Sequence, residues 1–182
     1  MNKINEIDVD ALKQFADAVT SDAAKGMAQF QVMTDWSGGT KSTSSVQELK
    51  LGDQRLARDF QILIDEPAEL LGDNTAANPQ ELLMAALNAC MIVGYVAAAS
   101  QENVQIKSLR IQTEGTLDLR GFLGLDDSIK PGYEEMQYKV IVSGDGTPEQ
   151  WARIHDTVTR TSPNRWNIAN AIHLNSELIV ES

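Results

Sequence analysis

Cys90 is the only cysteine in the chain, and it lies in the middle of residues 82–99, a run that contains no charged side chain. A cysteine becomes a nucleophile when its thiol ionises. Because the pKa of a free thiol is about 8.5, a reactive Cys90 needs a neighbouring group that stabilises the thiolate. Without such a group the same residue is ordinary packing, since free cysteine is among the most buried residue types.

The other residues that carry chemistry form no recognisable motif. His155 and His173 are eighteen residues apart and lack the spacing of a metal-binding pair. There is no GxSxG motif of a serine hydrolase, and neither Gly38-Gly39 nor residues 144–146 have the lysine of a phosphate-binding loop. We therefore expect no metal and no cofactor. The sequence favours either a thiol enzyme or a protein without catalytic activity.

The run around Cys90 predicts a long helix over about 79–100. Asn78 suits the N-cap, proline is favoured at the first helical position, and Glu81 at the third completes a capping box. The uncharged part would span about 27 Å, close to a bilayer core, but no Lys or Arg flanks it. We expect instead a helix buried on all sides by a sheet or by a second chain, with Gly94 at a close approach of backbones.

Composition indicates one folded domain. The 182 residues are 42% hydrophobic and 23% charged, which is ordinary for a globular protein. Fifteen basic and 26 acidic residues give a net charge of -11, so we expect no nucleic-acid partner and no membrane partner. A lone cysteine agrees with a reducing compartment, and no charged start followed by an apolar run is present, so we expect a cytoplasmic protein.

Hydrophobic periodicity predicts an α+β fold. Residues 4–27 repeat near the 3.6-residue period of a helix, whereas the residues that follow alternate with period two, as strands do. Before the central helix the expected strands cover 29–35, 46–51 and 60–64, with a turn at Gly52-Asp53. After it we expect strands over 106–119, with a bulge, and 135–143, then a helix over 147–159 and a final strand over 174–180.

Three motifs in this order resemble the OsmC/Ohr family of thiol-dependent hydroperoxide reductases. The first is 78–90, NPQELLMAALNAC, which is similar to the family's start of an alanine-rich helix that ends on its peroxidatic cysteine. The second comprises 120–126 and 131–134, and the third is 161–163 after the second helix. The resemblance implies the OsmC-like fold, in which antiparallel sheets wrap a long buried central helix in an intertwined homodimer.

The resemblance also implies a domain division and a reaction. An OsmC-like domain covers 28–182, and 1–27 is an N-terminal helical extension. At the subunit interface, the thiolate attacks an organic or inorganic hydroperoxide and becomes a sulfenic acid, which a second cysteine resolves. In the family, an arginine held by a glutamate supplies the positive charge.

This chain departs from the family pattern at three positions. Ser162 stands where the resolving cysteine is expected, Gln80 stands where the supporting acid is expected, with Glu81 beside it, and Lys41 follows the pair of glycines near which the arginine is expected. A lysine stabilises a thiolate as a point charge but lacks the planar fork of arginine. The predicted catalytic residues are therefore Cys90, Lys41, Gln80, Glu81 and Ser162, and turnover would require an external thiol reductant.

Each of these residues also has an ordinary structural explanation. Lys41 fits a solvated loop, and Gln80 and Glu81 suit the first turn of a helix. Arg160, Arg165 and Trp166 could supply cations and an aromatic wall if their segment lies against the thiol, but we favour the interpretation as basic residues that suit a helix end. The alternative function is a catalytically degenerate OsmC-like dimer that binds a small apolar ligand at its interface, and a third possibility is a scaffold without a ligand.

Overall fold

The computed structural model describes residues 2–181 and consists of two compact units, Met1–Ala85 and Ala86–Ser182, each treated by itself below. Antiparallel strands occur in both units, and one long helix begins in the first unit and continues in the second. The predicted α+β class is therefore confirmed. The division into 1–27 and 28–182 stays a prediction.

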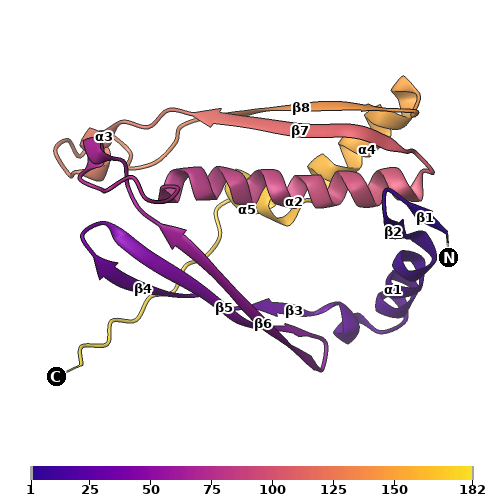
Figure 1. Cartoon of the computed structure of the whole chain (residues 1–182), viewed down its shortest axis with the longest axis horizontal. Coiled ribbons are helices and arrows are strands. Elements are labelled where there is room, and N and C mark those ends of the chain that lie inside the picture. Colours follow the sequence, from indigo (N-terminus) through magenta and orange to yellow (C-terminus); the bar gives the residue numbers. More distant parts are fainter. Residues whose placement is uncertain (1, 182) are drawn as a thin grey trace. The chain divides into compact units, whose positions relative to one another are not determined.

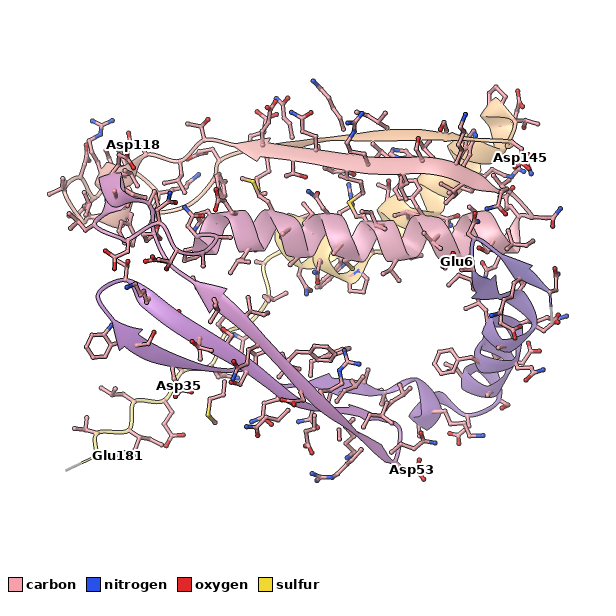
Figure 2. The ribbon with its side chains drawn as sticks, in the orientation of Figure 1. Glu6, Asp35, Asp53, Asp118, Asp145 and Glu181 are labelled. Carbon is pink, nitrogen blue, oxygen red and sulfur yellow. The ribbon has the colours of Figure 1, made fainter. Side chains whose placement is uncertain are left out.

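The first unit contains a four-stranded antiparallel sheet (Figure 1). Its strands are β3 (Ala28–Phe30), β4 (Met33–Gly38), β5 (Lys41–Leu51) and β6 (Gln54–Ile64). β5 pairs with β3 and β4 along one edge and with β6 along the other. The first predicted strand is thus split at Gln31 and Val32, and the other two are longer than expected. The predicted turn is confirmed: Gly52 has a φ of 58°, and Asp53 lies at the tip of the hairpin (Figure 2).

The predicted helix over 4–27 is only partly correct. A two-stranded ribbon, β1 (Lys3–Ile4) and β2 (Ile7–Asp8), precedes α1 (Val9–Ser21), and a 3-10 turn, η1 (Ala23–Gly26), follows it. Asn5 and Glu6 both have positive φ values, which a helix does not accommodate. The helix begins only where the Asp8 carboxylate accepts a hydrogen bond from the backbone N–H of Ala11.

The predicted central helix is confirmed as α2 (Pro79–Gln101), which follows a short 3-10 turn, η2 (Ala68–Leu70). Asn78 Oδ1 accepts a hydrogen bond from the Glu81 N–H at 2.8 Å, and Glu81 Oε2 accepts one from the Asn78 N–H at 2.9 Å. These reciprocal bonds are the expected capping box.

One side of α2 is buried and the other is not. Leu87, Met91 and Tyr95 are buried, whereas the side chain of Val93 is 69% exposed in the single chain. Among the described residues, α2 is the one helix whose length and composition would allow it to cross a membrane. The core helix of a soluble protein meets the same criteria.

The second unit packs α2 against a ribbon and a helix. The ribbon consists of β7 (Ile106–Gly115) and β8 (Met136–Gly144), runs alongside α2, and shows the predicted bulge as a register shift between Ile106 and Ser108 (Figure 1). The helix is α4 (Pro148–Thr161), which begins with a capping box between Thr147 and Gln150. The buried core of this unit comprises Leu87, Met91, Tyr95, Ala98, Ala99, Val104, Ile154 and Val158.

α4 runs antiparallel to α2. Glu102, the residue directly after α2, forms a salt bridge with Arg153 on α4 at 2.6 Å. Further toward the start of α2 and the end of α4, Gly94 approaches Val158. A Cβ at Gly94 would lie 3.3 Å from Val158 Cγ1, so this glycine marks a close approach of a side chain on α4 rather than of the predicted backbone. The next contact in the series involves Cys90.

Two predictions about the second unit are wrong. The loop expected after 119 contains a short helix, α3 (Leu119–Phe122), and a further helix, α5 (Pro163–Ala169), begins where none was expected. The segment expected as a strand over 174–180 has neither helix nor strand structure, and its Leu178 side chain is 87% exposed. A strand requires a neighbouring strand, and none of the described strands pairs with this segment.

Candidate functional site

The thiol of Cys90 accepts a hydrogen bond from the hydroxyl of Ser162. Cys90 lies in the middle of α2 and is partly exposed, and the distance from Ser162 Oγ to Cys90 Sγ is 3.4 Å. Ser162 is 4% exposed, so its hydroxyl has little access to water. The structure therefore brings together two of the five predicted site residues, although they are 72 positions apart in the sequence.

Local backbone structure fixes Ser162 at this position. It ends α4, where its N–H donates to the carbonyl of Val158 at 3.0 Å, and it also precedes Pro163, the first residue of α5. Proline at the first helical position ends one helix and starts the next, because it has no N–H to donate. The sequence Ser162-Pro163 thus forms a sharp junction between two helices beside the thiol.

α5 is attached to α2 next to Cys90. The side-chain amide of Asn164 donates to the carbonyl of Ala86 at 2.9 Å. In an α-helix that carbonyl also accepts from the N–H of the residue four positions later, which is Cys90. Two hydrogen bonds, one from Ser162 and one from Asn164, therefore hold the start of α5 against the turn of α2 that carries the thiol.

Arg165 lies in the first turn of α5 and bonds to uncharged acceptors. Its Nε donates to the hydroxyl of Tyr138 on β8 at 3.1 Å, and its Nη1 donates to the backbone carbonyl of Thr159 on α4 at 2.9 Å. Within residues 2–181 it has no carboxylate partner. Thr159 also has a buried hydroxyl without a hydrogen-bond partner.

The ribbon contributes polar contacts to α2 near Cys90. The hydroxyl of Thr113 on β7 donates to Asn88 Oδ1 at 2.5 Å, and the amide of Asn88 donates to the carbonyl of Ile111 at 3.4 Å. Thr113 and Tyr138 face each other in the antiparallel register of the ribbon. Cys90 thus lies in a part of the helix where polar partners replace the apolar contacts of the core.

A second polar pair lies further along α2, and its tyrosine is buried whereas its histidine is exposed. The hydroxyl of Tyr95 forms a hydrogen bond with Nδ1 of His155 on α4. Burial raises the pKa of Tyr95 to about 12, with a smaller contribution from Tyr138. At neutral pH the phenol is therefore protonated and can donate to the imidazole.

Lys41, the cation predicted from the sequence, is already paired. Its ammonium forms a salt bridge with the carboxylate of Asp73 in the first unit. The hydrogen bond and charge of Asp73, with a smaller contribution from Asp65, raise the pKa of Lys41 above its ordinary value. Its proposed role toward the thiol stays a prediction.

Asp65 organises the loop that holds this ion pair. Its Oδ1 accepts hydrogen bonds from the Thr40 hydroxyl at 2.7 Å and the Glu66 N–H at 2.8 Å. Its Oδ2 accepts from the Thr75 hydroxyl at 2.7 Å, the Thr75 N–H at 3.0 Å and the Asp73 N–H at 3.2 Å. These bonds, with that of Thr75 the largest, hold the pKa of Asp65 well below its ordinary value.

Gln80 and Glu81 lie in the first turn of α2, ten and nine positions before Cys90. Glu81 forms the capping box, which is a sufficient structural role, and the side chain of Gln80 is exposed. Their predicted catalytic roles stay predictions. No group of three His, Cys, Asp or Glu side chains that could hold a metal ion occurs among residues 2–181.

A cavity lies apart from the thiol, in the connection between β7 and β8. It has a volume of about 580 Å³. Asp118, which lines it, lies at the opposite end of the ribbon from Asp145 (Figure 2). A hydrogen bond from the Arg120 side chain lowers the pKa of Asp118 to about 2. Cys90 is not part of its lining.

Comparison with known proteins identifies the family. The family model described as "OsmC-like protein" matches residues 72–177, more than half of the chain and including both Cys90 and Ser162. The chain belongs to the OsmC-like family. No curated protein matches it.

Solved structures agree with this assignment. An OsmC-like protein from Mycoplasma pneumoniae aligns with a TM-score of 0.61 and 14% identity, over 78% of this chain and 87% of its own. An OsmC-like protein of unknown function from Vibrio cholerae aligns with a TM-score of 0.57 and 14% identity, over 76% and 92%. At these identities the likeness shows that this OsmC-like protein shares their fold.

Sequence reasoning missed one contributor to the site of this OsmC-like protein and favoured the wrong interpretation of another. Tyr138 appeared only as an alternating residue of a strand. Arg165 was considered as a cation beside Cys90, but its interpretation as a basic residue near a helix end was favoured. The sequence signal that could have placed Arg165 is Pro163, because a proline directly after a helix end favours a new helix that turns the following residues back toward the fold.

Proposed function

We propose that this OsmC-like protein reduces organic or inorganic hydroperoxides in defence against oxidative stress, with Cys90 as its single redox-active cysteine. The observation that carries the proposal is the 3.4 Å hydrogen bond from Ser162 Oγ to Cys90 Sγ. A donor directed at sulfur favours the thiolate over the thiol, and the thiolate is the nucleophile. Partial exposure of Cys90 supports the access that a small hydroperoxide needs.

The reaction has two halves. In the first, the Cys90 thiolate attacks one oxygen of the hydroperoxide, the O–O bond breaks, and an alcohol leaves after taking up a proton, or water when the substrate is hydrogen peroxide. The sulfur, now oxidised by two electrons, is a sulfenic acid. An external thiol then attacks that sulfur and releases water, which gives a mixed disulfide. A second external thiol attacks the mixed disulfide and returns Cys90 as a thiolate.

The external reductant is necessary because Ser162 cannot act as a resolving cysteine. A hydroxyl forms no bond to a sulfenic sulfur under these conditions, so the only thiols that can reduce Cys90 come from another molecule. The sum of both halves consumes one hydroperoxide and two thiols and produces one alcohol, one water and one disulfide.

We further propose that the chain acts as a cytoplasmic homodimer. The support is that the single chain leaves many large apolar side chains exposed. Single scattered apolar residues are normal on a protein surface, but this chain exposes more than that. It includes Trp36 and Leu63 in the first unit, Val93 on α2, and the segment with Leu174 and Leu178. A second copy would also provide the neighbour that the segment 174–180 lacks.

The proposal is tested by following hydroperoxide consumption in the presence of dithiothreitol. Wild-type protein is given tert-butyl hydroperoxide or hydrogen peroxide, and Cys90→Ser is measured in parallel. We expect multiple turnovers with two thiols oxidised per hydroperoxide, and none with Cys90→Ser. A variant that retains the wild-type rate, or a folded wild type no faster than buffer, would contradict the proposal. The second result would favour the catalytically silent dimer.

A further inference from the structure

We propose that Arg165 supplies the positive charge that stabilises the Cys90 thiolate, and that it replaces Lys41 in this role. The inference rests on the proposed function, because it concerns the same thiol. It assigns the charge to a residue on α5 rather than to Lys41, the first residue of β5.

The position of the thiol creates the need for a cation. Cys90 contacts Ser162, which is the residue that ends α4. The C-terminal end of a helix carries roughly half a negative elementary charge, from carbonyls without an intrahelical partner. The carbonyl dipoles of α4 therefore disfavour a thiolate here, and the opposing dipole of α5, which begins at the same junction, comes from a helix of only 7 residues.

Arg165 meets this need through its own hydrogen bonds. Its Nη1 donates to the carbonyl of Thr159, which belongs to the last turn of α4, at 2.9 Å. Ser162 is the residue that contacts the sulfur. Thr159 lies three positions before it and Arg165 three positions after it, each about one helical turn away. The guanidinium thus neutralises the helix end at which the thiolate forms.

The side chain of Arg165 is also held in place. Its Nε donates to Tyr138 on β8 at 3.1 Å, and Asn164 ties the same helix to Ala86 on α2 at 2.9 Å. Arg165 is half-buried, which reduces the screening of its charge by water. Both of its acceptors are uncharged, so no carboxylate among the described residues cancels that charge.

The other two candidate cations are compensated. Lys41 forms a salt bridge with Asp73. Arg160, in the last turn of α4, pairs with Asp156 at 3.8 Å, and its side chain is 69% exposed. A cation that is paired or solvated contributes less field at a neighbouring thiol than one that is half-buried and unpaired.

The remaining titratable groups on the elements around Cys90 are exposed or bound elsewhere. Tyr95 is bonded to His155 and Glu102 to Arg153, while the hydroxyl of Tyr138 accepts from Arg165. The other exposed titratable side chains on these elements are Glu81, Lys107, Arg110, Glu114, Lys139, Glu149 and Asp156. Arg165 is therefore the charged group that shares a contact network with Ser162 and α4 at the thiol.

The test measures the pH dependence of Cys90 alkylation by iodoacetamide, which needs no hydroperoxide and no dithiol. We expect Arg165→Met to raise the midpoint of the alkylation profile by about one pH unit and to slow alkylation at pH 7 about tenfold, since a nearby opposite charge shifts a pKa by about 1 to 3 units. Arg165→Lys, which keeps the charge, should lie closer to wild type. Arg160→Met, the matched control in the same region, should leave the midpoint unchanged.

An unchanged midpoint in Arg165→Met, or an equal shift in Arg160→Met or Lys41→Met, would overturn the assignment. Where Arg165→Met fails to fold, as judged by circular dichroism, Tyr138→Phe decides instead. It removes the acceptor of Nε while keeping the ring, and we expect a smaller rise of the midpoint. No rise there would also overturn the assignment. A shifted midpoint without peroxide turnover would keep this inference and contradict the proposed function.

Discussion

The hydroxyl of Ser162 donates a hydrogen bond to the sulfur of Cys90 across 3.4 Å, at the junction where α4 ends and α5 begins. This contact follows from the way the helices pack around the thiol. The antiparallel packing of α4 on α2 determines which residue reaches the thiol, and Pro163 directs the following residues of α5 along the same surface.

Replacing Ser162 by alanine removes the donor to the thiolate. Because a hydrogen bond to a charged group contributes about 1.5–3 kcal/mol, we expect the midpoint of Cys90 alkylation to rise by about one pH unit. The measurement is the rate of iodoacetamide reaction against pH. Thr161→Ala is the control, since the Thr161 hydroxyl is exposed and donates to the carbonyl of Thr157. An identical profile in Ser162→Ala would show that the hydrogen bond has no effect on the thiol.

Replacing Ser162 by cysteine should introduce the missing resolving thiol. The two side-chain atoms are already 3.4 Å apart, and a disulfide requires about 2.05 Å between sulfurs, so a small side-chain movement is sufficient. We expect one equivalent of hydroperoxide to produce an intramolecular disulfide, detected by mass spectrometry and by the loss of both free thiols. Persistence of two free thiols after oxidation in a folded variant would contradict the described geometry.

Asp65→Asn should destabilise the loop around Lys41. In one orientation the new amide NH₂ faces the Thr75 N–H and hydroxyl, and in the other it faces the Thr40 hydroxyl and the Glu66 N–H. In both cases donors face donors. We expect Tm to fall by at least about 4 °C. Asp73→Asn, at an exposed position, should change Tm much less because surface ion pairs contribute little.

The same variant predicts a pH dependence. The pKa of Asp65 is lowered in the folded state, so its stabilising contribution is present above the ordinary carboxyl pKa of about 3.9 and is lost as the pH falls below it. Urea unfolding of wild type and Asp65→Asn from pH 7 to pH 3 should therefore give a difference that shrinks with decreasing pH. A constant difference would contradict the assignment of the carboxylate as the charged acceptor.

The central helix and its start were predictable from the sequence because their signals are local. Asn78 and Glu81 form the capping box within four residues, and the uncharged run defines the length of α2. The strand over 174–180 was not predictable in the same way, because alternation describes a strand's faces but not whether a neighbouring strand exists.

The site was predictable only in part. The proximity of Ser162 to Cys90 was expected from the family resemblance, whereas the contacts of Arg165 depend on how α4, α5 and β8 pack. Its two acceptors, Tyr138 and Thr159, come from different elements. No periodicity or spacing in the sequence encodes such a combination.

Tyr95→Phe should remove a late step from the alkaline titration of the protein. The chain has three tyrosines, and burial raises the pKa of Tyr95 to about 12. Because the unfolded phenol ionises near pH 10, the contribution of Tyr95 to stability should fall as the pH rises from about 10 to about 12. Absorbance at 295 nm should show a late phase in wild type that is absent in Tyr95→Phe. Its presence in the variant would assign it to another tyrosine.

The chemistry of Cys90 is tested most directly by trapping its oxidised form. Wild-type protein and Ser162→Ala are treated with half an equivalent of tert-butyl hydroperoxide in the presence of dimedone, and the adduct at Cys90 is quantified by mass spectrometry over time. We expect rapid adduct formation on about half of the wild-type chains and slower formation in Ser162→Ala. A wild-type thiol that stays unmodified while the hydroperoxide remains unconsumed would contradict the proposed peroxidase function.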